Sequence, residues 1–174
     1  MHSTILKLFF LFLFLWGCST VHDPHQQSSR KVLAIQLMEL DEKISYHEAQ
    51  DLSSAIFQRS AVLDQMFERT GNPYMHNFLV NIGLKKKGLC YHYSDGLYSY
   101  LKQKNYSGFE FHLVGANIGD YWREHNALVV VAKGQKVMDG IVVDPWRDER
   151  ELYFSKISED RTYEWKHRIR RGCY

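Results

Sequence analysis

The stretch HNALVVVAKGQKVMDGIVVD, residues 125–144, contains two apolar runs on either side of a Lys-Gly-Gln-Lys turn. Short runs rich in β-branched residues and separated by turn residues predict a buried β-hairpin. The first run opens on His125 and the second closes on Asp144. An imidazole and a carboxylate at the two ends of a core hairpin are candidates for a functional pair.

The register of this hairpin decides whether the two side chains meet. A glycine at the first central position suits a two-residue type II′ turn, which centres the hairpin on Gly134 and Gln135. His125 then lies directly opposite Asp144 on the same face, with Cβ atoms about 5 Å apart. A rival turn at Asp139-Gly140 would drive the polar Lys-Gly-Gln-Lys stretch through mid-strand, so we favour the first register. A single bulge would separate the pair.

Three helices are expected before the hairpin. Ser45-Tyr46-His47-Glu48 fits a capping box, and apolar residues recur behind it at helical spacing until Gly71. Asn72-Pro73 is typical of an N-cap followed by proline in the first turn. A third apolar face begins at Cys90. The expected helices cover about residues 46–69, 73–82 and 90–104.

Strand patterns follow these helices. GFEFHLV, residues 108–114, alternates apolar and polar side chains, and the tail YEWKHRIRR, residues 163–171, is compatible with an edge strand. Helices first and an antiparallel sheet after them predict the α+β class. In this fold the N-terminal helices pack on the sheet, and Cys90 starts a central helix.

Length and composition fit one globular domain. The chain has 174 residues, of which 45% are hydrophobic and 24% are charged. The formal net charge is only +2, so we expect no nucleic-acid partner.

The N-terminus is a targeting segment rather than part of the fold. The apolar run at residues 8–16 follows Lys7 and is shorter than the roughly 20 residues of a spanning helix, which indicates a secretory signal peptide. Its end, Leu15-Trp16-Gly17-Cys18, resembles the bacterial lipoprotein signal, in which the cysteine receives a lipid. The other interpretations are a cleaved signal with an incidental cysteine or an uncleaved anchor.

This resemblance implies an organisation and a location. Residues 1–17 would be the signal peptide, residues 18–30 the lipidated Cys18 with a flexible tether, and residues 31–174 one domain. The lipid would hold the protein at a membrane of the bacterial cell envelope. Ser19 favours the periplasmic side of the outer membrane over the inner membrane.

Cys90 is a candidate nucleophile. It follows three lysines and Gly88 at an expected helix start, and both cations and a helix N-terminus lower the pKa of a thiol. Two structural roles compete with this one. Cys90 is either a buried core residue, or it forms a disulfide with Cys173 in an oxidising compartment.

Three short motifs occur in order: Gly88-Leu89-Cys90, His125-Asn126-Ala127 and Val143-Asp144-Pro145-Trp146. Together they resemble the transglutaminase-like branch of the papain-like thiol enzymes over about residues 85–147. Two positions depart from the pattern: Tyr91 follows the cysteine where tryptophan is frequent, and Asn126 follows the histidine where alanine is frequent.

The resemblance implies a mechanism on amide or ester bonds. Cys90 would attack the carbonyl, His125 would take and return the proton, and Asp144 would hold the imidazole. The backbone N–H of Cys90 would supply one oxyanion donor, with Asn81 or Tyr74 as candidates for the second. The implied substrate is an amide of a protein, a peptide or peptidoglycan, with hydrolysis as the default over deamidation or transamidation. No cofactor or metal is expected.

Several alternatives stay open. His112 is a second candidate base, whereas His92 would point away from Cys90 on a helix. A zinc site of Cys90, His112 and His125 lacks paired-ligand spacing, and a Cys-His-His amidase would need a polar residue near Val137. The basic residues 166–171 would suit anionic lipid or wall polymer. The chain could also be a non-catalytic envelope lipoprotein that binds a partner, with Cys90 structural.

Overall fold

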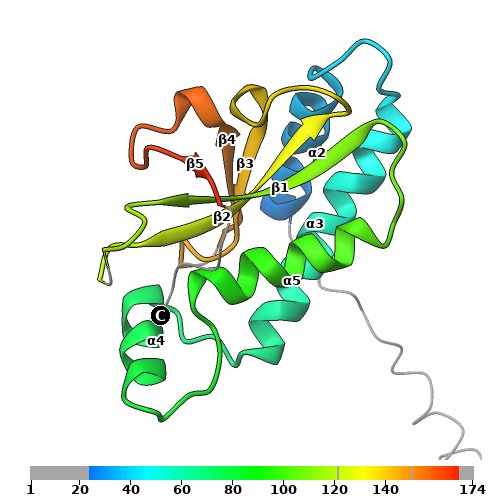
Figure 1. Ribbon diagram of the computed structural model, residues 1–174. Helices are drawn as coiled ribbons and strands as arrows, with labels where there is room; N and C mark the ends of the chain where they lie inside the picture. The colour runs from blue at the N-terminus through cyan, green and yellow to red at the C-terminus, as the bar shows by residue number, and fades with distance from the viewer. Residues whose placement is uncertain (1–23, 121, 150, 169–174) are drawn as a thin grey trace, which may run out of the picture.

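The computed structural model describes residues 24–120, 122–149 and 151–168 of the chain (Figure 1). The predicted signal peptide, the predicted lipidation site Cys18 and the second disulfide candidate Cys173 lie outside these residues. Within the described ranges, no helix combines the length and the apolar character needed to cross a membrane.

Helices precede strands in the chain, as predicted for an α+β domain. The strands form one antiparallel sheet in the order β4-β3-β2-β1-β5 (Figure 1). The helices are α2 (Pro24–Met38), α3 (Tyr46–Met66), α4 (Pro73–Asn81) and α5 (Cys90–Lys102). The strands are β1 (Phe109–Ala116), β2 (His125–Ala132), β3 (Ile141–Asp144), β4 (Tyr153–Lys156) and β5 (Lys166–His167), with short 3₁₀ turns η2 (Val137–Asp139) and η3 (Ile157–Glu159).

The sheet is covered on both faces. Helices α2, α3 and α5 pack on one face, where Leu128 and Val130 of β2 join the larger core. Val129 and Val131 point to the other face, because successive side chains of a strand alternate, and there they pack with Ile157 and Trp165. All eight residues of β2 are consequently buried, which explains the unbroken apolar run at residues 127–132.

Side-chain capping fixes the starts of two helices as predicted. Ser45 accepts the backbone N–H of Glu48 at 3.1 Å, and Asn72 accepts that of Met75 at 3.0 Å. The Glu48 carboxylate does not complete a capping box, however. It accepts the backbone N–H of Ser107 at 2.7 Å and so ties the start of α3 to the start of β1.

The stretch predicted as a tether is partly helical. Residues 24–30 form the first two turns of α2, so the prediction of a flexible tether to Arg30 is wrong for this part. The backbone carbonyl of Arg30 accepts a hydrogen bond from Ser53 of α3 at 2.8 Å, and the apolar face of α2 begins only at Leu33. The first two turns of α2 are polar and show no apolar spacing, so the sequence did not predict this helix.

The predicted hairpin exists, but its register differs by two residues. Leu128 pairs with Val143, and the same register extended places Ala127, not His125, opposite Asp144. The prediction failed because the connection is not a two-residue turn: η2 lies within it, and Gly134 adopts φ +82°. A shift of two keeps every side chain on its face, so His125 and Asp144 become diagonal neighbours on the same face.

Candidate functional site

Cys90 is the first residue of α5 and is 4% exposed. The turn before it is built on Gly88, whose φ of +117° disfavours residues with a side chain. The imidazole of His76 packs against this glycine and bridges two segments. It accepts the backbone N–H of Thr70 at 3.2 Å and contacts the carbonyl oxygen of Lys87 at 2.9 Å. The turn that presents the cysteine is therefore fixed by a buried histidine.

His92 also shapes this turn. Its Nδ1 lies 3.2 Å from the backbone nitrogen of Gly88 and 3.1 Å from that of Leu89, and accepts both N–H groups. The ring folds back over the helix start and satisfies donors that have no partner within a helix. His92 therefore caps α5.

His125 and Asp144 are in direct contact. The His125 Nε2 lies 2.5 Å from Asp144 Oδ2, and the two residues are 2% and 0% exposed. The other carboxylate oxygen accepts the backbone N–H of Trp146 at 3.2 Å. The carboxylate is thus held in one orientation by its own turn and by the imidazole.

Burial and charge act in opposite directions on this pair. Burial lowers the pKa of His125, but the adjacent Asp144 carboxylate and then the Cys90 side chain together outweigh burial and raise this pKa to about 9. Burial raises the pKa of Asp144, but His125 and then Arg147 outweigh it and hold this pKa below its ordinary value. The favoured state is therefore an imidazolium next to a carboxylate.

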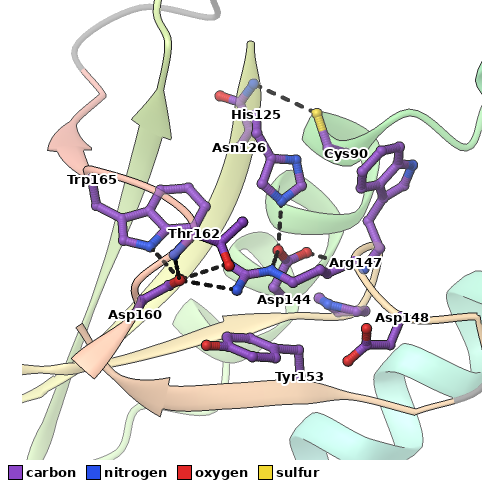
Figure 2. A network of polar contacts seen from close by, with 12 residues as sticks. Cys90, His125, Asn126, Asp144, Arg147, Asp148, Tyr153, Asp160, Thr162 and Trp165 are labelled. Atoms are coloured by element: carbon purple, nitrogen blue, oxygen red, sulfur yellow. Dashed lines mark hydrogen bonds and ion pairs between the residues drawn. The ribbon is translucent and has the colours of Figure 1, made fainter. Parts of the chain in front are cut away.

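The second nitrogen of the imidazole is available to the cysteine. Figure 2 shows the His125 ring between Cys90 and Asp144, and a hydrogen bond with the Cys90 side chain contributes to the raised pKa of His125. The sulfur also lies 4.0 Å from the carbonyl oxygen of Glu124. The structure thus brings the three candidate residues Cys90, His125 and Asp144 together in one contact chain, in the order that a nucleophile, a base and an orienting carboxylate would need.

Arg147 is a site residue that sequence reasoning missed. Its Nε lies 3.1 Å from Asp144 Oδ2, the same oxygen that His125 contacts. The other end of the guanidinium binds the Asp160 carboxylate at 2.7 and 3.2 Å, and its centre lies 3.7 Å from the ring centroid of Tyr153 (Figure 2). Asp144 is therefore bound to a positioned cation as well as to the imidazole.

Aromatic rings surround the imidazole. The ring centroids of Tyr163, Trp146 and Trp165 lie 4.5, 5.0 and 5.5 Å from that of His125. Trp165 also donates its indole N–H to Asp160 at 2.8 Å. These rings keep water from the His125–Asp144 contact, which strengthens its electrostatic attraction.

The turn after Asp144 is anchored to Arg69, which lies just beyond the end of α3. Arg69 donates hydrogen bonds to the carbonyl oxygens of Pro145 at 2.6 Å, Trp146 at 3.2 Å and Asp148. A single guanidinium thus fixes the backbone that carries both the carboxylate and its covering indole. No sequence pattern pointed to Arg69, because the contact spans more than 70 residues.

A second chain of polar contacts also reaches the cysteine. The Asn126 Nδ2 lies 3.8 Å from Cys90 Sγ, and its Oδ1 accepts a hydrogen bond from Arg168 at 2.8 Å. Arg168 also forms an ion pair with Asp95 of α5. The departure from alanine at position 126 therefore places an amide beside the sulfur.

The other sequence candidates lie elsewhere or have other contacts. His112 lies in β1 near Glu110, at 3.9 Å, and burial lowers its pKa. Asn81 is exposed at the end of α4, and Tyr74 is 68% exposed with its ring 5.7 Å from that of Trp146. In the described part of the chain, no three His, Cys, Asp or Glu residues are grouped to hold a metal ion.

The described contacts join a thiol, an imidazole and a carboxylate in one buried chain, and these are the groups that acyl transfer through a thioester requires. A scan against models of protein families finds no match to this chain, and searches of the curated proteins and of the solved structures also find no similar protein.

Proposed function

We propose that the protein is a thiol enzyme that acts on amide bonds through Cys90, His125 and Asp144. The observation that carries this proposal is the contact chain from the Cys90 sulfur through the imidazole to a buried carboxylate. The position of Cys90 at the start of a helix packed on an antiparallel sheet supports a transglutaminase-like core of the papain-like enzymes.

The charge state of the pair favours catalysis. Because His125 has a pKa raised to about 9, it is protonated at neutral pH and can stabilise a neighbouring thiolate. The thiolate rather than the thiol is the attacking species. Asp144 keeps Nε2 engaged, so the other ring nitrogen faces the sulfur and the substrate.

The reaction would proceed in two halves. The Cys90 thiolate forms a bond to the carbonyl carbon, and the C–N bond breaks as His125 gives its proton to the leaving amine. Water then attacks the thioester while His125 takes a proton from it, and the thiolate leaves. An amine in place of water would give transamidation, so hydrolysis is the default because water is always present.

We also propose that the protein is anchored to a membrane through a lipid. A lipid on Cys18 would hold the domain at the envelope membrane, on the periplasmic side of the outer membrane, close to peptide or peptidoglycan amides. The test is the fraction of wild-type and Cys18→Ser protein that sediments with membranes. Retention of the variant in the membrane fraction would exclude a lipid anchor at this residue.

The catalytic proposal is tested by the pH dependence of alkylation. We expect iodoacetamide to modify Cys90 at pH 6 at nearly its rate at pH 8, since the thiolate persists below the ordinary thiol pKa of about 8.5. The ratio of the two rates cancels the limited access to a buried sulfur. In His125→Ala the rate at pH 6 should fall to that of an ordinary thiol. An unchanged ratio would contradict the triad.

The competing structural role of Cys90 has a separate test. Peptide mapping by mass spectrometry without reduction would detect a Cys90–Cys173 disulfide. A stoichiometric disulfide in protein taken from the envelope would exclude the enzyme and leave a lipoprotein that binds a partner.

A further inference from the structure

Asn126 lies between the candidate nucleophile and the partly buried ion pair of Arg168 with Asp95. It is 1% exposed, and it points to the helix-covered face of β2 while its neighbour His125 points to the other. Its Nδ2 faces the Cys90 sulfur at 3.8 Å (Figure 2). A buried amide at this position contacts the sulfur atom that would react.

Arg168 fixes which end of the amide faces the sulfur. A guanidinium only donates hydrogen bonds, so the group 2.8 Å from it must be the amide oxygen. The NH₂ group is then directed toward Cys90, and its nitrogen also lies 3.5 Å from Glu124 Oε1. The opposite orientation would place N–H groups against the arginine and the oxygen lone pairs against a thiolate, which costs energy on both sides.

Arg168 is itself fixed at three points. Its side chain is 5% exposed and forms an ion pair with Asp95 of α5, the helix that Cys90 begins. Its backbone N–H donates to the carbonyl oxygen of Leu113 at 2.9 Å, which extends the pairing of β5 with β1. The arginine thus joins the helix, the sheet and the amide into one rigid unit.

We propose that Asn126 is the second oxyanion donor of the thiol enzyme proposed above, and that Arg168 and Asp95 are its positioning residues. This inference rests on the proposed function. When Sγ bonds to the carbonyl carbon, the carbonyl π electrons move to the oxygen. The oxyanion forms between the backbone N–H of Cys90 and the Nδ2–H of Asn126. On collapse the C=O bond re-forms and the leaving group departs.

Preorganisation gives the amide its effect. An oxyanion donor contributes most when it is already aimed at the position of the developing charge and need not reorient. The hydrogen bond from Arg168 holds the Asn126 amide in that orientation, and burial keeps water from competing for the amide N–H groups. Removal of one such donor typically lowers the rate about 100- to 1,000-fold.

Two reactions of the same sulfur separate this role from thiolate formation. Acetylation of Cys90 by p-nitrophenyl acetate passes through an oxyanion, whereas alkylation by iodoacetamide does not. For Asn126→Ala we expect the ratio of acetylation to alkylation rates to fall about 100-fold or more, with alkylation changed less than about threefold. Asn126→Asp keeps the shape and the Arg168 contact but has no N–H, so its ratio should fall as well. It replaces the alanine variant if that variant does not fold.

The controls separate the positioning residues from unrelated amides and charges. Arg168→Gln should lower the ratio about tenfold, because the amide loses its fixed orientation. Gln135→Ala at the exposed hairpin tip and Lys166→Gln, whose side chain is 70% exposed, should leave it unchanged. Rates are measured by intact mass spectrometry of folded protein.

The outcomes are distinguishable. A folded Asn126→Ala variant with the wild-type ratio, or one whose two rates fall equally, overturns the oxyanion role and leaves the triad intact. Failure of the wild type to acetylate at Cys90 faster than a free thiol overturns the proposed function and this inference with it.

Discussion

Gly88 lies directly against the imidazole of His76: a Cβ placed on Gly88 would lie 2.0 Å from His76 Nε2. The same histidine nitrogen contacts the carbonyl oxygen of Lys87 at 2.9 Å. The glycine before the Cys90 helix is therefore required both by its backbone angle and by the space that the histidine occupies. The Gly-x-Cys pattern in the sequence has this physical cause.

Gly88→Ala should lower the free energy of unfolding more than an alanine substitution at a glycine that has a positive φ but no close neighbour. Gly119 offers that control, since its φ is +92° but a Cβ there meets nothing within 4 Å. We expect Gly119→Ala to cost about 1–2 kcal/mol, which is the cost of the left-handed region, and Gly88→Ala to cost more. Urea denaturation of both variants measures this, and equal losses would contradict the His76 contact.

Asp144→Asn should move the pKa of His125 from above 6.5 to below it. Burial alone lowers this pKa, and the Asp144 carboxylate is the main group that raises it. The measurement is an NMR titration of the imidazole in a Cys90→Ala background, where the carboxylate acts without the thiolate. A pKa above 6.5 after the substitution would show that Asp144 does not set the charge of His125.

The stability of the Cys90→Ala variant should fall as the pH rises above 6.5. The folded state holds a proton on His125 that the unfolded chain releases near 6.5, so unfolding is favoured as the proton becomes scarcer. The fall ends once the pH exceeds the raised pKa of His125. Denaturant titrations across this range measure it, with Cys90→Ala/His125→Asn as the control that should lack the fall.

Arg147→Gln should destabilise the protein strongly. The side chains of Asp144 and Asp160 are only 1% and 0% exposed, and both lose a cation. Breaking a buried ion pair by removing one partner typically costs about 3–5 kcal/mol. Arg161→Gln, at an exposed position, is the control. A loss under about 1 kcal/mol, measured by urea denaturation, would show that the Arg147 contacts do not hold the carboxylates.

The sequence was most informative where local patterns carried the structure. Capping at Ser45 and Asn72 and the start of α5 at Cys90 follow from signals within a few residues. The hairpin placed His125 and Asp144 on one face, although its connection was longer than a tight turn and the register moved by two. Each side chain stays on the same face of the sheet after a shift of two, because side chains alternate between faces with a period of two residues.

The contacts that support the site were beyond local patterns. Arg69, Arg147 and Arg168 each reach a partner through a long side chain, and Arg69 and Arg168 do so across more than 40 residues of chain. The spacing of apolar and polar residues along the chain does not predict such a contact. Residues 153–156 form strand β4, which none of the predicted strands covers, and they do so by pairing with β3.

The Arg147 and Arg168 contacts depend on residues that follow the candidate triad in the chain. Asp160 and Trp165 complete the Arg147 cluster, and Arg168 follows Asp144 by 24 residues. During synthesis the chain therefore contains Cys90, His125 and Asp144 before it contains the residues that orient them. The candidate thiol can become organised only after residue 168 has been added, so the order of synthesis delays the assembly of the site.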